Sequence, residues 1–241
     1  MSEKRRKLLI CLHGSGDTGS GLRDWILSED EDFENRMREH DIDVVFPSAE
    51  HIPYSMANGM RMNVWFDRKG LGATFPEDKK GVRRSVDRIA SSYSKLNYTD
   101  VAVLGFSQGG CLSLHLGLGP SSLRYVSDIY KRVRSQHTHT HTNTHSNRIR
   151  SVVCMSSFLY DDSELFSYVS EHRSPPPLLM MHGNKDSMVP MSLGQGTFER
   201  FKKLSKKEWH IEWSEIPHLR HDMCCTELEY ACKFMIKHLN A

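Results

Sequence analysis

One serine lies in a setting that would make it a nucleophile. Ser107 is the third residue of the sequence GFSQGG at 105–110, between an apolar strand-like stretch at 101–105 and a helix-like stretch at 108–118. A sharp strand-to-helix turn projects a serine hydroxyl from the edge of a sheet, and glycines two residues before and after it prevent side-chain clashes. The pattern predicts a nucleophile elbow with Ser107 at its tip.

A serine nucleophile needs a base to accept its proton and an acid to orient that base. In α/β-hydrolases the three residues follow the chain order serine, acid, histidine. Asp186 comes just after the apolar stretch at 178–182, between the turn residues Gly183 and Pro190, and we predict that it is the acid. The alternatives follow the preceding strand-like stretch and are Asp161, Asp162 and Glu164.

The predicted base is His221, which lies between the last strand-like stretch at 209–214 and the terminal helix-like segment. His218 is the alternative, three residues earlier, and is expected to be an ordinary loop histidine. His115 falls inside the helix that follows the elbow and is expected to be packed or exposed. His182 ends a strand and is expected to stabilise the loop that carries the acid.

Acyl transfer also requires two backbone N–H groups for the oxyanion, one of them from the loop after an early strand. The loop at 13–19 is rich in glycine, which lets a backbone approach a ligand closely. We therefore predict the amides of Ser15 and Gln108 as donors and expect modest effects from side-chain changes at either position. Trp65 and Phe66 are candidate walls of the substrate site, with core packing as the competing interpretation.

The surrounding pattern predicts an α/β fold with a doubly wound, mostly parallel sheet in a single domain. Short apolar stretches alternate with longer segments of helical spacing, and most of the stretches lack the alternation of a half-exposed strand. The predicted strands are 7–12, 42–46, 101–105, 151–155, 178–182 and 209–214. The predicted helices are 79–97, 108–118, 162–173, 193–206 and 225–239.

The composition and the lengths of the apolar runs argue against several classes of protein. The 241 residues contain 32 Lys and Arg against 30 Asp and Glu, a formal charge of +2, which argues against a general nucleic-acid binder. The apolar runs are too short for a membrane-spanning helix, and the six cysteines lack the paired spacing of a metal site. We expect a soluble, cytoplasmic protein with reduced cysteines, in at most transient contact with membrane-bound substrates.

One segment departs from the pattern of a packed domain. Residues 136–148 alternate His and Thr without an apolar side chain, and we predict a solvated low-complexity loop within an insertion at 119–148. A repeated CA dinucleotide encodes this alternation, so we hypothesise an origin in repeat DNA. Metal binding by its histidines is the competing interpretation, disfavoured because ordering such a chain opposes binding.

Taken together, these motifs resemble the acyl-protein thioesterase/lysophospholipase family of α/β-hydrolases. The resemblance rests on the sequences LHGSGDTG at 12–19, VWFD at 64–67, GFSQGG at 105–110, HGNKD at 182–186, Val189-Pro190 and His221. It implies the triad Ser107, Asp186 and His221, with Ser15 and Gln108 as oxyanion donors. It also implies hydrolysis of thioesters or oxygen esters, palmitoyl-cysteine on proteins being the family's characteristic substrate, and in one branch a preference for shorter acyl chains. The insertion at 119–148 departs from the family pattern.

The predicted reaction is acyl transfer to Ser107 and hydrolysis of the acyl-enzyme, with no cofactor and no metal. Acylated proteins or small acyl esters would be the substrates. Two alternatives remain open. The first is a carboxylesterase or lysophospholipase of small esters. The second is a catalytically impaired relative that binds lipids or proteins, disabled by its insertion.

Overall fold

The computed structural model describes residues 6–241 except 94–95, 97, 121–147, 172–174 and 206–208. The predicted insertion at 119–148 and its His/Thr loop at 136–148 therefore lie almost wholly outside the described residues. No helix in the described part of the chain is both long enough and apolar enough to cross a membrane.

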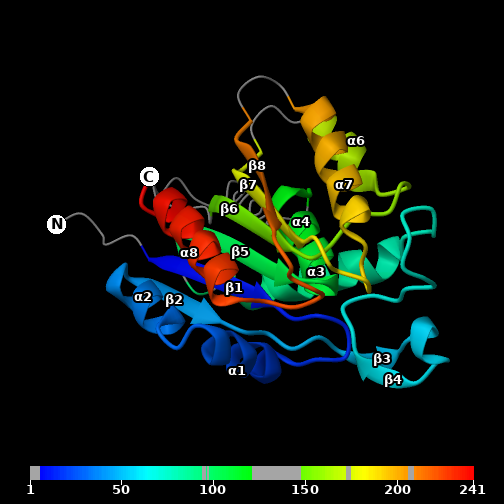
Figure 1. The fold of residues 1–241 in the computed structure, drawn as a ribbon, viewed down its shortest axis with the longest axis horizontal. Coiled ribbons are helices and arrows are strands. Elements are labelled where there is room, and N and C mark those ends of the chain that lie inside the picture. The colour runs from blue at the N-terminus through cyan, green and yellow to red at the C-terminus, as the bar shows by residue number, and fades with distance from the viewer. Residues whose placement is uncertain (1–5, 94–95, 97, 121–147, 172–174, 206–208) are drawn as a thin grey trace, which may run out of the picture.

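A six-stranded sheet forms the centre of the molecule (Figure 1). Its order is β2-β1-β5-β6-β7-β8, and every neighbouring pair is parallel. The strands are β1 (Lys7–Leu12), β2 (Ile42–Val45), β5 (Asp100–Phe106), β6 (Arg148–Met155), β7 (Leu178–Gly183) and β8 (Ile211–Ile216). After β1 the chain forms β2 at one edge of the sheet, and it then crosses over to form β5 on the other side of β1. Ligands in such sheets bind where the order reverses, beyond the carboxyl ends of the strands.

All six predicted strands and all five predicted helices are present, with ends that shift by a few residues. The helices are α1 (Gly19–Glu29), α2 (Phe33–Glu39), α3 (Lys79–Tyr93), α4 (Gln108–Leu118), α6 (Glu164–Glu171), α7 (Met191–Leu204) and α8 (Cys225–Leu239). The first two helices are additional to the prediction.

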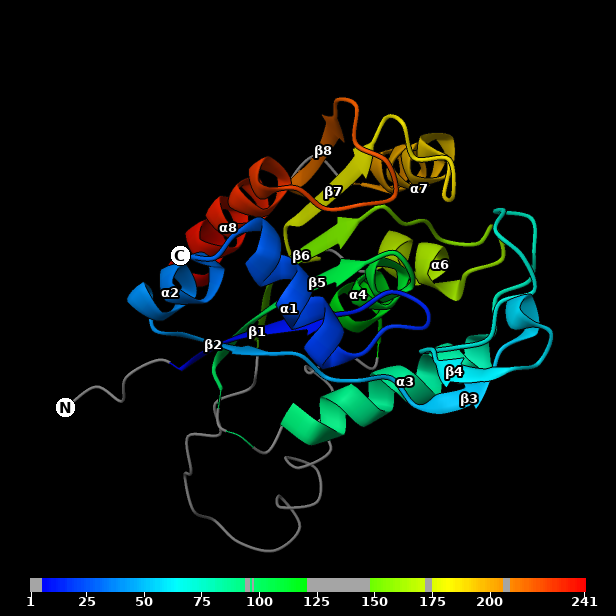
Figure 2. The same cartoon turned by 60° about the horizontal axis from the view of Figure 1, so that its bottom comes forward.

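Helices cover both faces of the sheet, which confirms the doubly wound architecture (Figures 1 and 2). Alternate residues of β1 enter two separate cores. Leu8 and Ile10 belong to the core that α3, α4, α6 and α7 also enter, and Leu9 belongs to the core that α1, α2 and α8 enter. Because both faces of each central strand are buried, β5 is buried at all of its positions. This explains the continuous apolar runs in the sequence.

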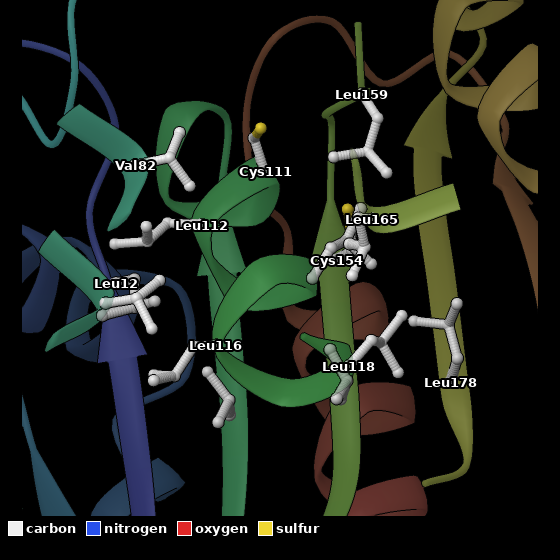
Figure 3. Packing of buried hydrophobic residues seen from close by; sticks show 14 of the residues in the cluster. Leu12, Val82, Cys111, Leu112, Leu116, Leu118, Cys154, Leu159, Leu165 and Leu178 are labelled. Atoms are coloured by element: carbon white, nitrogen blue, oxygen red, sulfur yellow. The ribbon is translucent and has the colours of Figure 1, made fainter. Parts of the chain in front are cut away.

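The helix α4 is buried along nearly its whole length. Figure 3 shows leucines of α4, among them Leu112 and Leu116, packed in the same cluster as Leu12 at the end of β1. Gly117 allows α4 to approach β6, since a Cβ there would clash with Val152. The sheet and α4 therefore form one rigid support for the turn at Ser107.

A small hairpin beyond the sheet was not expected from the sequence. It consists of β3 (His51–Pro53) and β4 (Arg61–Asn63), with the 3-10 turn η1 (Ser55–Ala57) between them. It contacts the glycine-rich loop after β1, where the Gly16 N–H donates to the Asn63 carbonyl at 2.9 Å. The hairpin thus lies at the carboxyl end of the sheet, beside the predicted site (Figure 2).

Candidate active site

The turn between β5 and α4 has the backbone of a nucleophile elbow. Ser107 has φ 53° and ψ −117°, a strained conformation for a non-glycine residue. A Cβ at Gly105 would clash with the Gly109 carbonyl, and one at Gly109 would clash with the carbonyls of Leu12 and His13. The two glycines therefore let the turn close on itself and against the end of β1.

Three side chains from three loops form a continuous hydrogen-bonded chain. His221 Nε2 lies 2.9 Å from Ser107 Oγ, and His221 Nδ1 lies 2.7 Å from Asp186 Oδ2. The His221 ring also packs against Phe106, at 4.9 Å between centroids. The structure thus brings together the predicted nucleophile, base and acid in a triad-like arrangement.

Asp186 is held as a carboxylate by its surroundings. Its Oδ1 accepts hydrogen bonds from the N–H groups of Met188 (3.0 Å) and Val189 (2.8 Å). Burial favours the neutral form, but hydrogen bonds from His182, His221 and the Val189 N–H outweigh it, and the pKa of Asp186 lies well below its ordinary value. A permanently charged acid is suited to stabilise an imidazolium at His221.

His182 supports the acid loop, as predicted. Its Nε2 lies 2.8 Å from the Val189 carbonyl and 3.3 Å from Asp186 Oδ2. Because a carbonyl only accepts, Nε2 carries a proton and donates it, whereas Nδ1 is buried and has no hydrogen-bond partner in the part of the chain that the structure describes. His182 therefore joins the Val189 backbone to the Asp186 carboxylate and holds the loop in place.

The alternative acids and base have other partners. The Asp162 carboxylate accepts from the Glu77 N–H, and those of Asp161 and Glu164 lie near Arg200 and Lys79, respectively. His218 has φ 62°, and its N–H donates to Asn184. The structure therefore places Asp186 and His221, and not these alternatives, beside Ser107.

The two predicted oxyanion donors flank the serine. A Cβ at Gly14 would lie 3.4 Å from that of Ser107, so the loop carrying Ser15 borders the elbow. Gln108 is the first residue of α4, where N–H groups have no acceptor within the helix. Within the described residues, neither the Ser15 nor the Gln108 N–H donates to a protein acceptor. Oxyanion binding by these two amides stays a prediction.

The side chain of Gln108 has a structural role that the sequence did not indicate. It is fully buried, accepts from the Trp65 N–H at 2.9 Å and donates to the Phe66 carbonyl at 2.8 Å. The expectation of modest side-chain effects is therefore revised for Gln108, because its amide joins the elbow to the 65–66 segment.

Trp65 and Phe66, the candidate walls of the substrate site, are both 0% exposed and belong to the core. The Trp65 indole donates to the His13 carbonyl at 2.8 Å, and its ring lies 4.8 Å from the His13 ring. This arrangement fixes the loop after β1. Contact of either ring with substrate stays a prediction, and it would require neighbouring side chains to move.

Comparison with known proteins assigns the chain to a family. The family model for phospholipases and carboxylesterases matches residues 1–125 and 138–239. The chain belongs to this family. Within the phospholipase/carboxylesterase family, the Ser107–His221–Asp186 arrangement is interpreted as a candidate catalytic triad.

Several family members and similar structures cover nearly the whole chain. Mouse lysophospholipase-like protein 1 is 26% identical over 92% of this chain and 82% of its own length. Acyl-protein thioesterase 1 of Gibberella zeae is 27% identical over 96% of this chain and 90% of its own length.

Among solved structures, Arabidopsis thaliana SOBER1 has a TM-score of 0.70 and 22% identity over 97% of this chain and 99% of its own. Zea mays acyl-protein thioesterase 2 has a TM-score of 0.68 and 20% identity over 99% of this chain and 96% of its own. At these identities the two structures establish the shared α/β-hydrolase fold.

Proposed function

We propose that this chain hydrolyses acyl thioesters and esters, with acylated cysteines of proteins as the substrate class. One observation carries the proposal: the hydrogen-bonded chain from Ser107 Oγ through His221 to Asp186, at 2.9 Å and 2.7 Å. Acylated proteins as substrates are supported by the relative named acyl-protein thioesterase 1, and oxygen esters by the relative named lysophospholipase-like protein 1.

In the proposed mechanism, Ser107 Oγ attacks the acyl carbonyl carbon while His221 Nε2 accepts the serine proton. The carbonyl oxygen becomes an oxyanion, which the Ser15 and Gln108 N–H groups stabilise. Collapse of this intermediate breaks the bond to the leaving sulfur or oxygen, and His221 returns the proton to it. Water then attacks the acyl-enzyme by the same sequence and releases the carboxylic acid and Ser107.

The groups around His221 act electrostatically. Asp186 holds the His221 proton on Nδ1, so that Nε2 presents a lone pair to the serine. The ion pair that forms during attack is stabilised because Asp186 stays charged. His182 and the N–H groups of Met188 and Val189 keep that carboxylate in place.

The first experiment is fluorophosphonate labelling of the purified full-length protein, with the modified peptide identified by mass spectrometry. We expect the label on Ser107 and its loss in Ser107→Ala and His221→Ala. His218→Asn is the matched control, since it removes a histidine of the same loop and tolerates the positive φ. A folded chain that takes no label on Ser107 would overturn the proposal and favour the lipid- or protein-binder alternative.

The substrate class is tested by kcat/KM over paired S-acyl and O-acyl substrates of increasing chain length. We expect turnover of S-palmitoyl peptides and a loss of at least about 10³-fold in Ser107→Ala. Turnover confined to short oxygen esters would instead identify a small-ester carboxylesterase. The proposed location is the cytoplasm, for which the six free thiols are the support.

A further inference from the structure

A second group of reactive side chains lies on α4, away from the triad. Cys111 and His115 are one turn apart, so they share a face of the helix. Glu77, from the loop before α3, meets them there: its Oε1 lies 2.9 Å from His115 Nε2. The three candidate ligand atoms, one from each residue, all lie within 4.8 Å of one another.

This cluster is separate from the proposed reaction. His115 follows Ser107 by eight residues, which corresponds to about 12 Å along a helix axis. None of the contacts within the triad involves Glu77, Cys111 or His115. Its chemistry therefore requires an explanation of its own.

Glu77 and His115 form a buried ion pair, and the Cys111 thiol interacts with the same histidine. The Glu77 side chain is 2% exposed, that of His115 11%, and Cys111 is fully buried. A thiol, an imidazole and a carboxylate together form the ligand set that a borderline-soft divalent cation prefers, whereas Mg²⁺ and Ca²⁺ prefer oxygen ligands alone. The composition of the cluster thus points to Zn²⁺.

The geometry accommodates such an ion with small side-chain movements. Zn–S bonds of about 2.3 Å and Zn–N bonds of about 2.0–2.1 Å place tetrahedral ligand atoms roughly 3.3–3.7 Å apart. The present spread of up to 4.8 Å approaches that range, and the 2.9 Å Glu77–His115 contact would widen as the ion replaces the proton between them.

A cavity of about 270 Å³ adjoins the cluster and is lined by Glu77 and His115. It lies between α3 and α6, and its lining also includes Lys79 and Glu164, whose charged groups are 3.5 Å apart. The cavity offers an entry path and room for a water molecule as a fourth ligand, which completes the usual four-coordinate shell.

We propose that Glu77, Cys111 and His115 form a Zn²⁺ site, with water from the cavity as the fourth ligand. Cys111 binds as the thiolate, and its proton leaves to solvent when the ion enters. The ion would join α4 to the segment before α3. It therefore supports the helix that carries Ser107 at its N-terminal end and takes no part in acyl transfer.

The test is a titration of the full-length protein with Co²⁺, a spectroscopic substitute for Zn²⁺, followed by displacement with Zn²⁺. A thiolate-to-metal charge-transfer band reports a cysteine ligand, whereas the four histidines between 137 and 145 offer only nitrogen. We expect one band that saturates at one equivalent and disappears when Zn²⁺ is added. Absence of the band from the folded chain would overturn the proposal.

The variants identify the ligands. Cys111→Ser should abolish the band, and Cys225→Ser, at an exposed thiol, should leave it unchanged. Glu77→Gln and His115→Asn retain the thiol and should each weaken Co²⁺ binding at least about tenfold. Circular dichroism verifies folding of every variant. A band that survives Cys111→Ser, or an affinity unchanged in Glu77→Gln, contradicts this assignment.

Discussion

At the scale of single residues, the protonation pattern of the triad depends on Asp186. Its Oδ1 already accepts two backbone N–H groups, and only Oδ2 faces His221. An asparagine would keep its oxygen toward those N–H groups and turn its NH₂ toward Nδ1. The His221 proton would then move to Nε2, where the ring cannot accept the proton of Ser107.

We therefore expect Asp186→Asn to lower kcat/KM by about 10³–10⁴-fold while the fold is retained. Asp161→Asn is the control, because Asp161 was an alternative acid and its side chain is 63% exposed. Steady-state kinetics on a chromogenic acyl ester measure both variants. Equal losses in the two would contradict the assignment of the acid.

Gln108 and Ser15 are both proposed oxyanion donors, but their side chains differ in burial. Gln108→Ala leaves the Trp65 N–H and the Phe66 carbonyl without their buried partner, at roughly 1–3 kcal/mol for each unpaired group. Ser15 is exposed, and its hydroxyl has a 3.4 Å contact with Tyr54.

We expect Gln108→Ala to lower the free energy of unfolding by at least about 2 kcal/mol, and Ser15→Ala to change it by at most about 0.5 kcal/mol. Urea denaturation followed by tryptophan fluorescence measures both. If the two variants were equally stable, the tether from Gln108 to the 65–66 segment would be unimportant.

At the scale of elements, the elbow depends on close contact between backbones. A Cβ at Gly109 would clash with carbonyl oxygens at the end of β1, which cannot move without disrupting the sheet. At Gly196, inside α7, no described atom beyond its chain neighbours and the nearby backbone of its own helix lies within 4 Å of the position that a Cβ would take. The same substitution should therefore have opposite effects at the two positions.

We expect Gly109→Ala to unfold the protein or abolish labelling of Ser107, and Gly196→Ala to stabilise it by about 0.5–1 kcal/mol through helix propensity. Thermal unfolding and labelling are measured on both variants. A fully stable, fully labelled Gly109→Ala protein would show that the turn is looser than its contacts indicate.

The helix α8 buries a carboxyl group near the catalytic loop. Glu227 is 0% exposed and neither of its carboxylate oxygens has a hydrogen-bond partner among the described residues. Burial, together with the charge of Asp222, raises the pKa of Glu227 to about 8 from an ordinary 4.5. The folded chain thus keeps this proton at pH values where the unfolded chain has lost it.

Stability should consequently fall as the pH rises from about 4.5 to about 8, by up to roughly 1.4 kcal/mol per pH unit from this group. Glu227→Gln should remove that dependence and be the more stable protein at pH 8. Denaturant unfolding at pH 5, 6.5 and 8 tests this. The prediction fails if wild type and variant show the same slope.

At the scale of the whole molecule, the features that could be predicted from the sequence are those that depend on strand order and local turns. Ser107, Asp186 and His221 each follow a strand, and parallel strands bring their carboxyl ends to one edge. The helices α1 and α2 were missed because each buries few apolar side chains, Leu22 and Ile26 in the first.

Other features depend on contacts between distant segments, and no local pattern signals them. The Gln108 amide binds a backbone segment 43 residues earlier in the chain, and His115 pairs with Glu77 at a separation of 38 residues. The hairpin of β3 and β4 has only three residues per strand, none of them fully buried, so it shows little apolar alternation.

The order in which the triad residues occur has a consequence for protein synthesis. Ser107 precedes His221 by 114 residues, a gap of roughly 6–23 s at translation rates of about 5–20 residues per second. During that interval the growing chain carries its serine without its base. Under the proposed mechanism, a growing chain that has not yet reached His221 has no esterase activity, and hydrolysis begins only after the loop between β8 and α8 has folded.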